Sequence, residues 1–74
     1  MRNVFMRALN LHGHEFDLAL CGVNANGQVK SGDILIRPSR GYAAMHNLPG
    51  PWDCELQART SILAKAREIA EQYS

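Results

Sequence analysis

Histidine and cysteine are the residues of this chain best suited to chemistry, and it contains three histidines and two cysteines. His12 and His14 lie one residue apart, so their imidazoles could share a metal ion. A zinc site needs further protein ligands, however, and Cys21, Cys54 and His46 stand at no spacing typical of such sites. The sequence therefore favours exposed turn histidines over a metal site, and we expect neither a metal nor a cofactor.

A cysteine can also act as a nucleophile when a histidine beside it serves as the base. Cys21 and Cys54 both fall in segments that we expect to be strands, where a small buried thiol is ordinary. Cys21 lies on the strand face opposite Leu20 and is the more accessible of the two. A catalytic cysteine needs a pocket, which a chain this short barely provides, and no P-loop, GxSxG or HExxH motif is present. We expect two reduced structural thiols and no enzymatic activity.

A third candidate group follows the expected end of a strand. Arg37 and Arg40 flank Ser39, and guanidinium groups bind phosphates and carboxylates in a bidentate manner. The segment lacks the glycine-rich cradle and helix N-terminus that make a phosphate site specific. Tyr42 and His46 come next, and exposed aromatic residues are enriched at protein interfaces. We take Arg37, Arg40, Tyr42 and His46 as a candidate interaction surface.

The charge balance bears on the class of partner. Eight basic and seven acidic residues give a formal charge of +1. Nucleic-acid binders usually carry a strong basic excess, because contacts with phosphates supply most of the affinity. The charge therefore disfavours nucleic acid without excluding it. The residues that could serve such a partner, if they gather on one side of the sheet, are Arg2, Arg7, Lys30, Arg37 and Arg40.

No apolar run approaches the roughly 20 residues that span a bilayer, and the first residues lack the apolar core of a signal peptide. Two cysteines are too few for a disulfide framework. We therefore expect a cytoplasmic protein with no membrane partner.

The element that the sequence specifies most strongly is a helix over Thr60–Tyr73. Six apolar residues fall on one stripe at 3.6 residues per turn, and the opposite side is charged or polar apart from Ala64. A helix of this length is marginal by itself in water, so the stripe must pack against another element. The stripe consists of Ile62, Leu63, Ala66, Ile69, Ala70 and Tyr73.

Strands are expected over Val4–Leu11, Glu15–Val23 and Gln28–Arg37. The first of these segments lacks clean alternation, so a short helix is the alternative there. The first two are joined by a tight turn at His12–His14, and the last two by a type I′ turn at Asn26-Gly27. A two-residue turn at that position would place Ile34 on the wrong face of the sheet. We therefore predict a β-bulge at Ser31-Gly32 that restores a single apolar face.

The segment after Arg37 is harder to assign. Pro38–Pro51 is rich in proline and glycine and is predicted to be a loop. Trp52–Arg59 alternates apolar and polar residues without exception, so we predict a fourth strand there, followed by a helix capped at Thr60 or Ser61. The alternative is one helix from Pro51 to Tyr73, which a Glu55–Arg59 pair would help to stabilise.

These elements predict one small α+β domain spanning residues 1–74. It comprises an antiparallel, meander-like sheet of four strands with one amphipathic C-terminal helix on one face. The core is expected to contain Phe16, Leu18, Leu20, Ile34, Ile36, Trp52 and Leu56 against Ile62, Leu63, Ala66, Ile69 and Tyr73.

For function, the leading hypothesis is a non-catalytic interaction module that binds another protein or a second copy of itself. The contact would be an edge strand (Val4–Leu11 or Trp52–Ala58) or the uncovered face of the sheet. The alternatives are a nucleic-acid-binding domain that uses the scattered arginines, and a small metal or thiol site built on His12, His14, His46 and Cys21.

Overall fold

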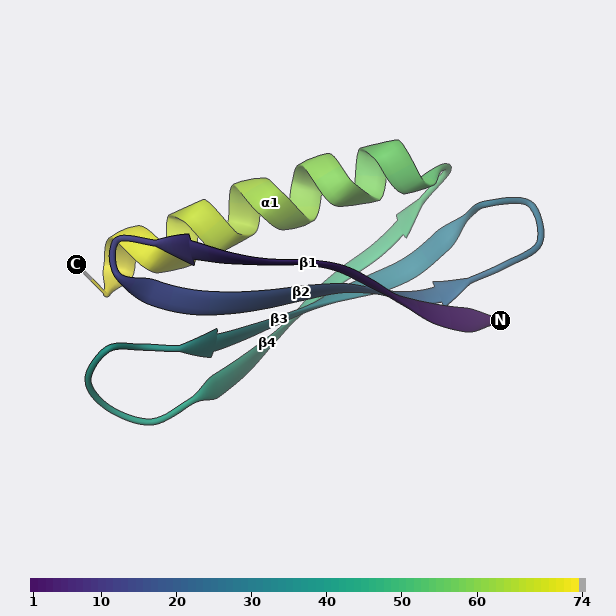
Figure 1. The fold of residues 1–74 in the computed structure, drawn as a ribbon. Helices are drawn as coiled ribbons and strands as arrows, with labels where there is room; N and C mark the ends of the chain where they lie inside the picture. Colours follow the sequence, from purple (N-terminus) through teal and green to yellow (C-terminus); the bar gives the residue numbers. More distant parts are fainter. Residues whose placement is uncertain (74) are drawn as a thin grey trace.

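The computed structural model describes residues 1–73, which form four strands followed by one helix. The elements are β1 (Arg2–Leu11), β2 (His14–Val23), β3 (Val29–Arg37), β4 (Ala44–Trp52) and α1 (Glu55–Gln72). The strands pair in chain order, all antiparallel, and α1 runs across one face of the sheet (Figure 1). The predicted α+β class, with an antiparallel meander and a C-terminal helix, is confirmed. Within residues 1–73, no helix is both long enough and apolar enough to cross a membrane.

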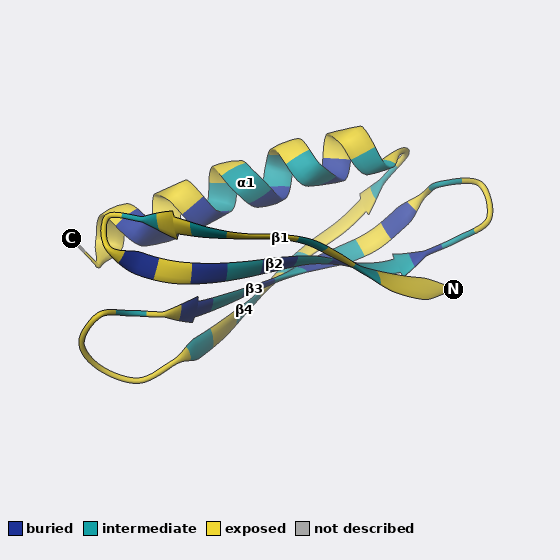
Figure 2. Cartoon of the chain, viewed as in Figure 1, coloured by how far each residue is buried: buried dark blue, intermediate teal, exposed yellow. Residues whose placement is uncertain are grey.

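The core lies between α1 and the central strands β2 and β3 (Figure 2). β1 and β4, the edge strands, contribute side chains that are only partly buried against it. Two of the predicted core residues lie elsewhere: Leu56 is 74% exposed, and Tyr73 is 39% exposed at the end of the helix. The buried hydrophobic residues are Phe16, Leu18, Leu20, Val23, Val29, Ile34, Ile36, Ala58, Ile62, Ala66, Ile69 and Ala70.

The tight turn that the sequence predicts between β1 and β2 is present, but it has two residues and not three, because His14 already belongs to β2. His12 and Gly13 both have positive φ, 53° and 82°, which is the combination that a type I′ turn requires. Within residues 1–73, His12 is the one non-glycine residue with positive φ. Asn10 supports the turn, because its Oδ1 accepts a hydrogen bond from the backbone N–H of Gly13 at 3.1 Å.

The hairpin between β2 and β3 differs from the prediction. The type I′ turn is wrong because Asn26 does not have positive φ, whereas Gly27 does, at 82°. The loop instead closes around Asn24, whose Oδ1 accepts hydrogen bonds from the backbone N–H groups of Asn26 (2.9 Å) and Gln28 (3.0 Å). Gly27 also donates its N–H to the carbonyl oxygen of Asn24 at 3.0 Å.

The predicted bulge at Ser31-Gly32 is wrong as well. The β2–β3 register is regular, with Leu18 opposite Ile34 and Leu20 opposite Gly32. One extra residue in the loop shifts the pairing by one position, so the apolar residues share a face without any bulge. Gly32 serves the packing of the helix instead. A Cβ there would lie 2.6 Å from Ile62 Cγ1, so the missing side chain makes room for Ile62.

The segment after Arg37 requires two corrections. Most of the predicted loop is strand β4, whose prolines Pro49 and Pro51 are tolerated because an edge strand need not donate every N–H. The predicted strand Trp52–Arg59 is wrong: Trp52 ends β4, and α1 begins at Glu55 with Cys54 as its N-cap.

The early start of the helix leaves its apolar face intact because the charges at its beginning lie at the margin of that face. Glu55 forms ion pairs with Arg59 at 3.5 Å and with Arg2 of β1 at 3.7 Å. All three side chains remain at least one-third exposed. The sequence objection to a helix starting before Arg59 therefore fails, because neither Glu55 nor Arg59 enters the core.

Candidate functional site

The four residues of the predicted interaction surface do not come together. Arg37 ends β3 and pairs with side chains of β2. His46 lies opposite Ile34, a buried core residue on the side of the sheet that α1 covers, and its Nε2 atom is buried without a hydrogen-bond partner. Arg40 and Tyr42 lie in the loop between β3 and β4, where Tyr42 is 95% exposed. Arg40 and Tyr42 thus share only their place in this exposed loop.

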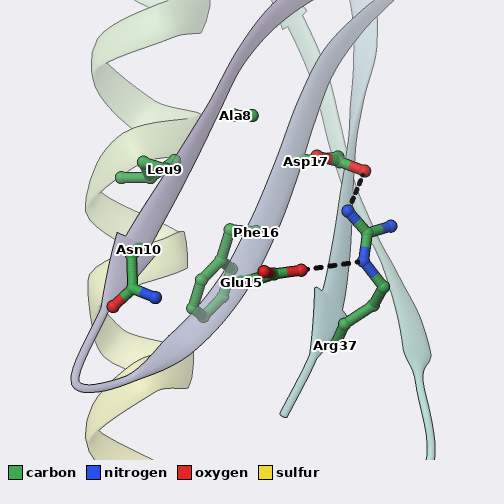
Figure 3. Close-up of a pocket in the computed structure, with 7 residues that line it drawn as sticks. All are labelled: Ala8, Leu9, Asn10, Glu15, Phe16, Asp17 and Arg37. Carbon is green, nitrogen blue, oxygen red and sulfur yellow. Dashed lines mark hydrogen bonds and ion pairs between the residues drawn. The ribbon is translucent and has the colours of Figure 1, made fainter. Parts of the chain in front are cut away.

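Arg37 sits at one end of a shallow depression of about 340 Å³ (Figure 3). Its Nη2 lies 2.8 Å from Asp17 Oδ2, and its Nε lies 3.5 Å from Glu15 Oε2. The bond to Asp17, then the negative charge of Asp17, raises the pKa of the guanidinium above its usual value. Two carboxylates therefore already occupy the fork, and Arg37 is poorly placed to bind an incoming anion. The depression is lined by Ala8, Leu9, Asn10, Glu15, Phe16, Asp17 and Arg37.

Cys21 belongs to a polar row that crosses three strands. Its Sγ donates to Asp33 Oδ2 at 3.2 Å, and Asn47 Nδ2 donates to Asp33 Oδ1 at 2.9 Å. Partial burial raises the pKa of the thiol, and the hydrogen bond to Asp33 and its negative charge raise it further. The thiolate is the nucleophilic form of cysteine, so this environment makes Cys21 a weak nucleophile.

The two histidines of the first turn have different environments. His12 is exposed, but His14 is only 7% exposed, so the prediction of two exposed histidines is wrong for His14. Its Nδ1 accepts a hydrogen bond from the backbone N–H of Ser39 at 3.0 Å, and its ring contacts Tyr73 edge-on at 5.7 Å. The sequence contained a signal for the burial of His14, because His14, Phe16 and Leu18 are alternate residues of one strand and therefore face the same side.

The reactive residues thus remain dispersed over the fold. The expectation that Cys21 is the more accessible thiol is wrong. Cys54 is an exposed free thiol at the N-cap of α1, whereas Cys21 is a half-buried free thiol in β2. No three His, Cys, Asp or Glu side chains within residues 1–73 gather closely enough to hold a metal ion.

The basic residues also fail to form one surface. Arg2 pairs with Glu55, and Arg37 pairs with Glu15 and Asp17. Lys30 lies at the end of the sheet where Val23 pairs with Val29, whereas Arg40 follows the opposite end, where Glu15 pairs with Arg37. The basic residues therefore lie toward both ends of the sheet, and two of them are already ion-paired.

The sheet face that points away from α1 is covered by no other element of residues 1–73, and we call it the open sheet face. Phe5, Ala19, Asp33 and Asn47 form one row across the four strands, and Ala8, Asp17, Leu35 and Met45 form the next. Phe5 is 63% exposed and Met45 60% exposed, and Leu35 between them is half-buried. Sequence reasoning missed Met45, because its segment was taken for a loop, and it did not single out Phe5.

Comparison with known proteins finds no matching family model, no similar curated protein and no similar solved structure. Function therefore has to be inferred from the geometry of the chain itself.

Proposed function

We propose that the protein is a non-catalytic interaction module that binds another protein through its open sheet face. The observation that carries the proposal is the exposure of Phe5 and Met45 on a face that no helix covers. With Ala8, Ala19 and Leu35 they supply apolar surface across all four strands. Exposed apolar surface of this kind marks interaction sites more often than a single scattered residue does.

The polar groups on the same face suit an interface rather than a reaction. Asp17 and Asp33 lie on the central strands, between the exposed apolar residues of the two edge strands, and with Arg37 they are already hydrogen-bonded or ion-paired within the chain. A protein–protein contact typically contains polar groups and hydrogen bonds beside its apolar area. Because these three groups already have partners, a protein that covers the apolar residues would not leave them unsatisfied.

The candidate catalytic groups support the same proposal. The surroundings of the Cys21 thiol raise its pKa and so favour the protonated form, and its hydrogen-bond partner is the weakly basic carboxylate of Asp33 and not a histidine. A cytoplasmic location belongs to the proposal, since free thiols at Cys21 and Cys54 suit a reducing compartment.

The test is a comparison of variants in extracts of the native host. We expect the Phe5→Ser/Met45→Ser variant to lose the binding partner that the wild-type chain captures after cross-linking. Leu56→Ser is the matched control, because Leu56 is 74% exposed on the helix side of the molecule. Equal capture by all three chains would contradict the proposal, as would salt-sensitive binding of mixed DNA or RNA that survives the Phe5 and Met45 changes.

A further inference from the structure

We propose that two copies of the chain pair antiparallel along β1, with Leu9 of one copy opposite Leu9 of the other, so that one continuous sheet runs through both. This inference goes beyond the proposed function, because pairing at the edge leaves the open sheet face of each copy free.

The two edges of the sheet are unequally protected. β4 carries Pro49 and Pro51, which lack an N–H, and its register with β3 shifts between the pairs that involve Val29 and Ser31. β1 contains no proline, and from Arg7 to Leu11 it keeps a constant register with β2. An edge strand with free backbone groups is a ready template for another strand. The stretch Arg7–Leu11 is therefore the better site for pairing.

The helix also leaves β1 incompletely covered. A helix is about 10 Å wide and strands are about 4.8 Å apart, so one helix covers about two strands. Phe16 and Leu18 on β2 are at most 1% exposed, whereas Leu9 and Leu11 on β1 are only partly buried against the same core. A second copy beside β1 would remove the remaining apolar surface of these leucines from water while it satisfied the backbone groups of the edge.

The alternation of hydrogen bonds along β1 selects the residues that can pair. In a two-residue hairpin the pair that flanks the turn exchanges both backbone hydrogen bonds, and successive pairs then alternate. The flanking pair here is Leu11 and His14. Leu9 therefore directs its backbone groups toward β2, whereas Ala8 and Asn10 direct theirs toward the free edge.

Symmetric pairing about Leu9 satisfies this alternation. It places Ala8 of each copy opposite Asn10 of the other, so that their outward N–H and C=O groups meet. It also places Arg7 opposite Leu11, which keeps the two Arg7 charges from facing each other. The two-fold axis stands perpendicular to the sheet, so both helices lie on the same side and both open sheet faces on the other.

In the neighbouring registers, fewer residues of the regular stretch Arg7–Leu11 pair with the second copy. Symmetry about Ala8 would place Leu11 opposite Phe5, across the register shift that lies between Phe5 and Arg7. Symmetry about Asn10 would place Ala8 opposite His12, which lies in the turn. Pairing about Leu9 alone engages the whole regular stretch of both copies.

Cysteine cross-linking tests the register directly. In a chain with Cys21→Ser and Cys54→Ser, we expect Leu9→Cys to form a disulfide-linked dimer under mild oxidation. Ala8→Cys and Asn10→Cys chains should link to each other when mixed, and neither should link to itself. Phe5→Cys is the matched control, because Phe5 is on the same strand and 63% exposed but has no partner at this register. Cross-linking of Phe5→Cys as efficient as that of Leu9→Cys would overturn the proposal.

A second measurement uses the outward N–H of Ala8. Ala8→Pro removes this donor from both copies, and Arg7 before it is already extended, as a proline requires. We expect the dissociation constant measured by sedimentation to rise about tenfold or more, whereas Ala8→Val should leave it close to wild type. A wild-type chain that is monomeric at every concentration would overturn the pairing. It would leave the Phe5 and Met45 experiment untouched, so the two proposals fail independently.

Discussion

The Cys21 thiol donates to Asp33 Oδ2 at 3.2 Å, and Asn47 holds the other oxygen of that carboxylate. Residue types alone identify Cys21 as a possible nucleophile. Its neighbours decide otherwise, because a carboxylate beside a thiol opposes formation of the thiolate. The chemistry of this residue therefore depends on cross-strand neighbours that lie 12 and 26 positions away in the sequence.

This arrangement predicts a specific pH dependence. The pKa of Cys21 is raised above its ordinary value of 9.0, so the unfolded chain loses this proton at lower pH than the folded chain does. The stability linked to Cys21 should be fully present below pH 9.0 and be lost as the pH rises through the folded pKa. Urea titrations of Cys54→Ser with and without Cys21→Ser should diverge above that pH.

Thiol reactivity gives an independent check on Cys21. At pH 8, Cys21 should react with iodoacetamide more slowly than exposed Cys54, measured in the two single-cysteine chains. Asp33→Asn removes the negative charge and should accelerate the reaction of Cys21. An unchanged rate would show that Asp33 does not control the thiol.

Gly32 provides a second prediction at the residue scale. A methyl group at this buried position would overlap Ile62, so Gly32→Ala should lower the free energy of unfolding by about 1–3 kcal/mol. Ile62→Val removes the terminal carbon and should relieve part of the overlap. The double variant should therefore be more stable than the sum of the single changes predicts, as a urea double-mutant cycle would measure. Strict additivity would contradict the close contact.

At the scale of the element, the β2–β3 loop determines which side chains of β3 face the core. Asn24 holds the loop because its side chain accepts two backbone hydrogen bonds. Asn26 does not have positive φ, so its backbone conformation does not favour asparagine over other residues. Asn24→Ala should therefore cost about 1–2 kcal/mol. Asn26→Ala should change the free energy of unfolding by less than about 0.5 kcal/mol. Equal costs in urea unfolding would favour the type I′ turn expected from the Asn-Gly sequence.

The beginning of α1 yields another element-scale prediction. Cys54 occupies the N-cap with φ −150° and makes no side-chain hydrogen bond to the first turn. Cys54→Ser places a good capping oxygen there and should stabilise the protein by about 1 kcal/mol. Cys54→Ala should not, and it controls for loss of the thiol. If the helix began at Thr60 instead, the Cys54→Ser and Cys54→Ala variants would have the same melting temperature in thermal unfolding.

At the scale of the whole molecule, one helix is too narrow for the sheet it covers. β2 and β3 are sealed, while the apolar residues of the edge strands remain partly exposed. The chain is elongated, with extents of 39 × 17 × 17 Å, so a large fraction of its residues lies at the surface. A domain of this size is expected to have a free energy of unfolding of only about 4–11 kcal/mol.

Association through β1 should therefore be visible in the melting temperature. If the folded state is a dimer and the unfolded chain is monomeric, a tenfold rise in protein concentration should raise Tm by about 3–5 °C. At concentrations below its raised dissociation constant, Ala8→Pro should show no such dependence, and Ala8→Val should preserve it. A Tm that does not change with concentration would argue against a stable dimer, as scanning calorimetry can establish.

Local patterns were sufficient to predict the α+β class, the strands β2 and β3, a tight turn after β1 and most of the apolar stripe of α1. These features depend on residues close together in the chain, so the sequence contains the whole signal. It also indicated that the arginines and histidines form no recognisable motif.

The fourth strand, the start of the helix and the surroundings of each reactive side chain were decided by tertiary structure. Pro49 and Pro51 look like loop residues until the strand that holds them is known to be an edge. Glu55 and Arg59 look misplaced on a helix until the margin of its buried face is known. Pairing between strands and packing between layers join residues that are distant in sequence, and local patterns do not encode which distant groups will meet.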